Sequence, residues 1–464
     1  MSDTTDIQTH IAIVGAGFCG VALARALAMH APAGTRAALI GTADDFGRGL
    51  AYAHVRPEHA LNVRAKDMGI DPSNLGGFAD WLQLEGEARD GFASRRAYGD
   101  FINAELDAAL ARNAPRLTLD RIAARVLGIE RGVRGFTLSF DDGTKLQARQ
   151  VVLATGTLPP SPLPQLDPAL RATPHYLESP WLPGALERID ADADVLVVGT
   201  GLTFADIAAT LQVRGHRGRV LAISRHGLRP QAQPDSPLPP FVLPPEVLAA
   251  WDRGNVKAVL HELHRAAKTA PDWRALIDAL RPRLQSFWKS LDATQRKRFL
   301  RHAASYWDIH RHRLSPETAA KLKALQASGQ LRIEAARLVS AKLVDGRVEA
   351  QLRPRHGSGI RAASFDVLVR ATGLVLDLRS TRHEPYARLI AQGLMQADPL
   401  GLGVIADDQG RVLGAAGAPV PGLSVLGPLQ RPQFWEITAV PELRVAALAL
   451  GQRLAGELAS ELRL

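Results

Sequence analysis

The chain has almost no cysteine, since Cys19 is the only one among its 464 residues. One thiol cannot build a disulfide framework, a CxxC redox pair or a thiolate zinc site within a chain. The sequence therefore excludes enzymes that work through a dithiol pair. Cys19 itself lies in a glycine-rich turn, where a small buried filler is the favoured interpretation and a reactive thiol at a helix start is the alternative.

Long apolar runs are absent as well. No stretch approaches the ~18 consecutive apolar residues of a membrane span, and the opening MSDTTDIQTH is too polar for a secretory signal. Apolar residues still make up 46% of the chain, which is enough to bury several cores, and the length suggests about two or three domains. We therefore expect a folded cytoplasmic protein that does not enter a membrane.

Positive charge exceeds negative charge, with a formal net charge of +9. Residues 251–330 account for it, because they hold sixteen Lys and Arg against seven Asp and Glu. Solvated helix faces are the favoured interpretation. The alternatives are an anion-attracting rim around a phosphate-bearing cofactor or acidic substrate and, third, a nucleic-acid surface. No nucleic-acid-binding motif accompanies the charge, so we expect no such partner.

A glycine-rich turn follows the first apolar segment. HIAIVGAGFCGVALARALAMH predicts a strand over residues 11–14, a turn and a helix. GAGFCG matches GxGxxG, in which the first glycine permits the tight turn, the second admits a pyrophosphate and the third lets the helix pack on the strand. The N–H groups at the helix start favour phosphate. The predicted dinucleotide contacts are Gly15, Gly17, Phe18, Cys19 and Gly20.

The same arrangement recurs in DVLVVGTGLTFADIAATLQ, with a strand over residues 195–198 and a helix from about Thr203. Phe204 stands at the third glycine position, a departure that weakens close helix packing. The first two glycines keep the phosphate role. The predicted contacts of this second turn are Gly199, Gly201, Leu202 and Thr203.

Each copy also ends alike, with an Asp-Gly hairpin turn and then an apolar strand followed by Ala-Thr-Gly. The hairpin turns are at residues 142–143 and 345–346. A chance sequence would rarely place a glycine turn, an Asp-Gly hairpin and Ala-Thr-Gly in that order twice. The repetition is therefore stronger evidence for two dinucleotide-binding units than either glycine fingerprint alone. The residues predicted to contact cofactor at these endings are Thr155, Gly156, Thr372 and Gly373.

The residue after the next strand distinguishes the two nucleotides. An acidic residue there suits a ribose 2′-hydroxyl, whereas Arg suits a 2′-phosphate. In the second unit this strand ends at Ser224 and Arg225, which favours NADPH; an exposed loop residue is the alternative for Arg225, and Arg217, Arg219 and Arg229 are competitors.

In the first unit the strand ends at Gly41 and Thr42, without the acid expected of an FAD fold. Asp44 or Asp45, or backbone and water, are the alternatives for the ribose. The next stretch offers Gly47, Arg48 and Gly49, a backbone open to phosphate beside one cation. We therefore predict that Arg48 faces the FAD pyrophosphate, with an exposed glycine turn as the alternative.

The stretches GAGFCG, FGRGLAY, LNVRAKDM, FADWL, RRAYGDF and VVLATG resemble a bacterial FAD/NAD(P)-binding flavoprotein family. GTGLTFAD, ISRHGLRP and GPLQRPQFWEITAVPELR extend the resemblance over most of the chain. Family members include an FAD-dependent urate hydroxylase and a monooxygenase that oxidises the amine of aspartate to nitrosuccinate.

The resemblance implies an α/β fold of two dinucleotide-binding, Rossmann-like domains, with the NADPH domain inserted into the FAD domain. Together with proline-rich joints at residues 158–168 and 229–245, it gives FAD-binding parts at 1–165 and 371–464 and an NADPH-binding domain at 166–370. The latter carries an α-helical insertion at about 236–330.

The resemblance also implies which residues surround FAD. The C-terminal segment would approach the flavin with Gly427, Trp435 and Glu436. Candidates for walls of the flavin ring are Tyr52, Asn62, Tyr98 and Trp435, for which core packing is the alternative. The remaining FAD contacts are Gly15, Gly17, Gly20, Gly47, Arg48, Gly49, Thr155 and Gly156.

The implied activity is that of a monooxygenase, in which NADPH reduces FAD and a flavin hydroperoxide hydroxylates a urate-like purine or an amino-acid amine. The cofactor carries the hard chemistry, so no catalytic dyad is expected. His310 and His312 lack further ligands, so we expect no metal. The alternatives are an NADPH-dependent flavin reductase or dehydrogenase that oxygenates nothing and a non-catalytic nucleotide-binding redox sensor.

Overall fold

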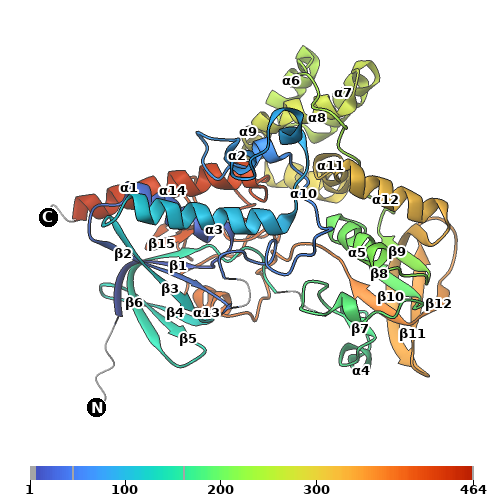
Figure 1. The fold of residues 1–464 in the computed structure, drawn as a ribbon, viewed down its shortest axis with the longest axis horizontal. Coiled ribbons are helices and arrows are strands. Elements are labelled where there is room, and N and C mark those ends of the chain that lie inside the picture. The colour runs from blue at the N-terminus through green and yellow to red at the C-terminus, as the bar shows by residue number, and fades with distance from the viewer. Residues whose placement is uncertain (1–6, 44–45, 160–161, 462–464) are drawn as a thin grey trace. The chain divides into compact units, whose positions relative to one another are not determined.

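The computed structural model describes residues 7–43, 46–159 and 162–461. The chain divides into two compact units, each with its own sheet (Figure 1). The first unit comprises Met1–Ala53, Arg64–Pro159 and Val375–Leu464, and the second comprises His54–Val63 and Pro160–Leu374. No helix of the described residues is long and apolar enough to cross a membrane.

The sheet of the first unit has eight strands in the order β14-β15-β6-β1-β2-β3, with β5 pairing both β6 and β4. The neighbours from β15 to β3 are parallel, whereas β14, β4 and β5 pair antiparallel. The bounds are β1 Ile7–Val14, β2 Thr35–Gly41, β3 Leu117–Ala123, β4 Val126–Gly132, β5 Gly135–Phe140, β6 Lys145–Leu153, β14 Arg411–Leu413 and β15 Pro419–Val425.

Three long helices lie beside this sheet: α1 (Phe18–His30), α3 (Arg95–Arg112) and α14 (Val440–Glu461). Helix α1 packs against both others. Gly451 permits the close approach of α14, because a Cβ there would stand 2.6 Å from the Ala26 Cβ. The shorter elements are α2 (Gly77–Trp81), α13 (Tyr386–Ala391) and 3₁₀ turns at Ala65–Asp67 and Gly86–Asp90.

The sheet of the second unit has seven strands in the order β12-β11-β10-β9-β8-β13-β7. The neighbours from β10 to β7 are parallel, and β10, β11 and β12 form antiparallel hairpins. The bounds are β7 Tyr176–Leu177, β8 Val195–Val198, β9 Val220–Ser224, β10 Leu331–Val344, β11 Arg347–Pro354, β12 Arg361–Phe365 and β13 Val367–Arg370.

Helices α5 (Leu202–Val213) and α12 (Pro316–Ala327) pack together in this unit, where short turns also occur at α4 (Pro168–Arg171) and Leu186–Arg188. The predicted helical insertion is confirmed between β9 and β10. Side chains of Asn255, Asp272 and Asp292 cap three of its helices. Its helices are α6 Pro245–Asp252, α7 Val256–Thr269, α8 Trp273–Leu280, α9 Leu284–Ser290, α10 Ala293–His302 and α11 Ala304–Arg311.

The predicted α/β fold class is confirmed: each glycine turn lies between a parallel strand and a helix, β1 and α1 in the first unit and β8 and α5 in the second. The second Asp-Gly turn joins β10 to β11, with positive φ at both Asp345 (49°) and Gly346 (74°). That conformation is the type I′ turn that suits a hairpin.

Phe204 stands at the third glycine position of the second turn, where a glycine would let the helix pack closely on the strand. The Phe204 side chain is part of the core. It is completely buried among apolar residues of β8, β9 and α5. Thus the second unit carries a buried aromatic ring at the motif position where the first unit has Gly20.

We expect Phe204→Ala to destabilise the second unit by about 3–5 kcal/mol, because a buried ring is replaced by a cavity. Thermal and denaturant unfolding would measure this. The control is Val213→Ala on the same helix, where the side chain is 56% exposed. Equal stability of the two variants would contradict a core role for Phe204.

Candidate functional site

The first glycine turn presses against the end of β6. Gly15 has φ +115°, and a Cβ there would stand 2.4 Å from the Ala154 carbonyl oxygen. A Cβ on Gly20 would stand 1.9 Å from the Gly15 oxygen. Only glycine fits either position, so α1 begins directly at the carboxyl ends of the parallel strands.

A second glycine loop meets this turn. Gly49 has φ +62°, and its Cβ would stand 2.8 Å from the Gly17 Cα. Arg48 is half-exposed and forms an ion pair with Asp100 of α3. The two backbones together form a cradle that could hold a pyrophosphate, with one partly neutralised cation beside it.

Asn103 holds the second loop in place. Its side-chain amide donates hydrogen bonds to the Gly47 oxygen at 2.9 Å and to the Gly99 oxygen at 2.8 Å. Sequence reasoning missed both Asn103 and Asp100. The one signal was their spacing within RRAYGDFIN, which places them on neighbouring turns of a helix.

Asn103→Ala is expected to weaken FAD binding about tenfold, because two hydrogen bonds that fix the loop are lost. Flavin fluorescence during titration of the apoprotein would measure the change. Asn113→Ala is the control, because among the described residues that amide donates to Ala109 of its own helix, at 2.8 Å, and not to a glycine loop. If both variants bind FAD like the parent, the loop does not depend on Asn103.

Cys19 packs against the C-terminal segment. A Cβ on Gly427, whose φ is +108°, would stand 2.9 Å from the Cys19 Sγ. Burial raises the pKa of the thiol to about 12. The interpretation of Cys19 as buried filler is therefore confirmed, and the thiol stays protonated at neutral pH.

The aromatic candidates occupy different settings. Tyr98 has no exposed surface, and its ring centroid is 5.0 Å from that of Tyr52 and 5.0 Å from that of Phe78. This setting favours core packing, the alternative for Tyr98, with its ring packed against Tyr52; a role in the wall of the flavin ring stays a prediction. Burial also raises the pKa of the Tyr52 hydroxyl, which keeps that group neutral.

Trp435 and Glu436 are each only 3% exposed. The Arg431 guanidinium lies 3.7 Å from the centroid of the Trp435 ring and donates from Nε to the Trp435 oxygen at 3.2 Å. Asn62 belongs to the second unit, where its carbonyl accepts from Gln233 at 3.0 Å.

The Ala-Thr-Gly ending of β6 leads into open space. No atom lies within 4 Å of a Cβ built on Gly156, whose φ is +76°. Thr155 shares a hydrogen bond with the hydroxyl of Tyr386, a residue that sequence reasoning missed. Burial raises the pKa of Tyr386 to about 12, so this hydroxyl can donate to Thr155 at neutral pH.

The second glycine turn repeats the first. Gly199 has φ +120°, and a Cβ there would stand 2.0 Å from the Ala371 oxygen. Gly201 is exposed, with no atom within 4 Å of a built Cβ. Leu202 and Thr203 begin α5. The turn therefore offers free N–H groups at a helix start to a phosphate.

Thr372 and Gly373 are both exposed after β13. Gly373 has φ +82°, and a Cβ built there would meet no atom within 4 Å. This second Ala-Thr-Gly ending is thus as open as the first.

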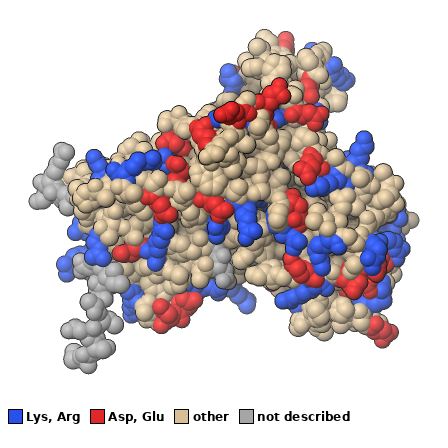
Figure 2. Space-filling model, in the orientation of Figure 1, with Lys and Arg blue, Asp and Glu red and all other residues tan. Residues whose placement is uncertain are grey.

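The cations near the second turn differ in their partners. Thr200 donates to the Ser224 Oγ at 2.8 Å, which joins the glycine turn to the end of β9 beside the exposed Arg225. Arg217 and Arg219 instead form ion pairs with Asp192 and Asp194. Over the face drawn in Figure 2, acidic and basic side chains are likewise interspersed. Arg225 therefore remains available to a ligand after two of its competitors are neutralised.

Asp44 and Asp45 lie outside the described residues, so the ribose alternatives of the first unit stay predictions. Among the residues that are described, no group of three His, Cys, Asp or Glu could hold a metal ion. His310 donates from Nδ1 to the Tyr306 oxygen at 2.7 Å and packs edge-on against Trp273.

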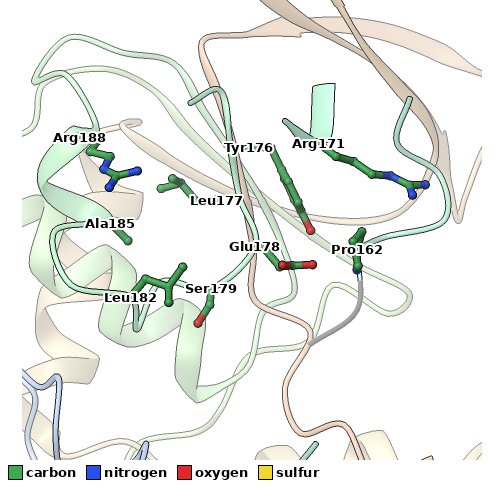
Figure 3. A pocket seen from close by; sticks show the side chains of 9 residues that line it. All are labelled: Pro162, Arg171, Tyr176, Leu177, Glu178, Ser179, Leu182, Ala185 and Arg188. Carbon is green, nitrogen blue, oxygen red and sulfur yellow. The ribbon is translucent and has the colours of Figure 1, made fainter. Parts of the chain in front are cut away.

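A cavity of about 170 Å³ lies beside β7. Tyr176 and Glu178 line it from β7 and the residue that follows, with Arg171 and Arg188 on opposite sides (Figure 3). None of the predicted cofactor contacts lines this cavity. It therefore does not mark the nucleotide-binding turns.

Residues 12–158 match a protein family described as FAD-NAD(P)-binding. No curated protein matches the chain in sequence. Among solved structures, ornithine N-hydroxylase from Kutzneria sp. 744 is 18% identical, with a TM-score of 0.59, over 98% of this chain and 99% of that chain.

The cadaverine monooxygenase DfoA of Erwinia amylovora, solved bound to FAD, is 14% identical with a TM-score of 0.63, over 96% of this chain and 94% of that chain. Thioredoxin reductase of T. acidophilum is 13% identical with a TM-score of 0.52, over 99% and 100%. The chain therefore shares its α/β fold with these enzymes, two of them oxygenating and one a thioredoxin reductase.

Proposed function

We propose that the protein is an FAD-dependent, NADPH-using monooxygenase that hydroxylates a small polar nitrogen-containing substrate, either an amino-acid amine or a urate-like purine, with dioxygen as co-substrate. The observation that carries the proposal is the pair of equivalent glycine turns, Gly15 against Ala154 and Gly199 against Ala371. Two such turns provide for two dinucleotides in one chain.

The first turn is assigned to FAD. Gly17 and Gly49 would bring backbone N–H groups to the pyrophosphate, with Arg48 beside them and Asn103 fixing the loop. When bound, FAD supplies the redox and oxygen chemistry. The residues of this unit bind and orient it, and the buried Tyr52 and Trp435 exclude water from their surroundings.

The second turn is assigned to NADPH. Gly199 shapes the turn, and Gly201 leaves room for the pyrophosphate at the start of α5. Arg225 supplies a cation at the ribose end of the site, where an NAD-preferring site carries an acid.

A reductase that passes electrons to another acceptor is the second candidate, because the thioredoxin reductase likeness shows that this fold also serves non-oxygenating enzymes. The single Cys19 excludes a dithiol mechanism within one chain. A reductase function would therefore need an external acceptor.

The test is anaerobic reduction of the purified flavoprotein by NADPH, with and without a panel of purines and amino-acid amines, followed by mass analysis of aerobic products. We expect one substrate class to yield a product 16 mass units heavier per oxygen atom, coupled to NADPH oxidation. Formation of hydrogen peroxide alone with every compound would favour the reductase. A colourless protein that takes up no FAD would contradict both.

A further inference from the structure

Neighbouring strand ends of the second unit converge on the residues that follow β9. β10 runs parallel to β9, with Ala335 level with Ser224. Gly227 is so near β10 that a Cβ there would stand 2.8 Å from the Ala335 nitrogen. The Arg355 N–H donates to the Ala335 oxygen at 2.7 Å. The end of β11 is thereby fixed beside Arg225.

Four exposed arginines lie at this edge: Arg225 after β9, Arg337 on β10, and Arg353 and Arg355 at the end of β11. Arg337 and Arg353 stand directly opposite each other in the antiparallel ladder, where like charges destabilise a sheet. Within the described part of the chain, none of the four forms an ion pair with a carboxylate. An anionic ligand would relieve this repulsion.

Other arginines of the same hairpins are neutralised. Arg332 and Arg361 both form ion pairs with Glu334, at 3.3 Å and 2.8 Å. The absence of a carboxylate partner is therefore a property of this edge of the sheet and not of the hairpins as a whole.

His226 lies among these cations. An N–H of the Arg355 guanidinium donates to its Nδ1, and its ring centroid is 5.9 Å from that of Tyr306. Burial, and then the charges of Arg355, Arg225 and Arg337, lower the pKa of His226. The imidazole is therefore neutral at pH 7 and can accept the hydrogen bond that orients Arg355.

We propose that Arg337 and Arg355 join Arg225 in binding the 2′-phosphate of NADPH, with His226 as the positioning residue for Arg355. This inference rests on the proposed function, which assigns NADPH to the second turn. A phosphate monoester carries close to two negative charges and three acceptor oxygens, which guanidinium groups match with paired N–H donors. The hydroxyl of NADH leaves the arginines unneutralised, so this edge selects the phosphorylated nucleotide.

The test uses the FAD-loaded protein and calorimetric titration with adenosine 2′,5′-bisphosphate and adenosine 5′-monophosphate. We expect the parent protein to prefer the bisphosphate. Arg355→Ala and Arg337→Ala should each lower the affinity for the bisphosphate about tenfold or more, because each removes charged hydrogen bonds. The affinity for the monophosphate should stay the same. Arg361→Ala, on the neighbouring strand β12, is the control and should change neither affinity, because Arg361 already forms an ion pair with Glu334.

His226→Ala should lower the preference for the bisphosphate, and His226→Asn should restore it, because the amide oxygen can accept from Arg355. A parent protein without preference, or variants that weaken both nucleotides equally, would overturn the proposal. The titration requires no turnover. If the protein prefers the bisphosphate yet oxygenates no compound, the proposed monooxygenase function is wrong and the proposed 2′-phosphate site is still supported.

Discussion

A Gly15→Ala protein is expected to purify without its yellow colour. Gly15 has φ +115°, and the new Cβ would stand 2.4 Å from the Ala154 oxygen and 2.8 Å from the Thr155 Cα. Both obstacles are backbone, so the turn must move away from β6. Strain of about 1–3 kcal/mol from φ and a similar cost of overpacking together correspond to a loss of about 30-fold or more in FAD affinity.

The measurement is the molar ratio of flavin to protein after purification, followed by titration of the apoprotein with FAD. Gly34→Ala is the matched control, because Gly34 also has positive φ, +81°, but a built Cβ meets no atom within 4 Å. The control bears backbone strain without displacing the glycine turn, so it should remain yellow. If the Gly15→Ala protein retains flavin as well as the Gly34→Ala protein does, the assignment of FAD to the first turn is wrong.

The parts of the fold that the sequence predicted are those with local causes. The glycine turns and the two Asp-Gly hairpins need particular φ values that glycine supplies at fixed positions. The parallel strands are short apolar runs next to those turns, and the strand ends at Gly41 and Ser224 follow from the same pattern. Such signals lie within a few residues of the structure they specify.

Contacts between distant segments had no such signal. Asn103 reaches the Gly47 loop from helix α3, and Tyr386 reaches Thr155 from helix α13 in the C-terminal part of the first unit. The sequence around each of these residues does not indicate which distant residue it contacts. The sequence left Tyr98 open between a flavin wall and core packing for the same reason, because the rings packed around it come from several elements.

The segment 54–63 shows the limit most clearly, because it follows a glycine loop of the first unit yet packs in the second. His59 hydrogen-bonds to Thr210 of α5 at 2.9 Å, and Arg56 forms an ion pair with Glu187. The family resemblance placed Asn62 with Tyr52 near the flavin, whereas the division into compact units assigns the two residues to different units. Patterns of hydrophobicity predict elements but not which core receives them.

Gly199→Ala is expected to have the complementary phenotype: a yellow protein that NADPH reduces far more slowly. Gly199 has φ +120°, and its Cβ would stand 2.0 Å from the Ala371 oxygen. The second turn must therefore shift, while the first unit keeps every contact of its own glycine loops. Anaerobic stopped-flow reduction should show a loss of about 100-fold or more in the second-order rate constant with NADPH.

Gly201→Ala distinguishes distortion of the turn backbone from filling of the space that the pyrophosphate would occupy. Gly201 has φ −85°, which alanine adopts without strain, and a built Cβ meets no atom within 4 Å. The free protein should thus be unaffected. Any loss of affinity for NADPH would then show that the ligand occupies this space. Gly215→Ala, at a positive φ of +71° in open space after α5, is the control. If Gly201→Ala binds NADPH as well as Gly215→Ala does, the pyrophosphate does not lie on the second turn, because that contact leaves no room for a methyl group.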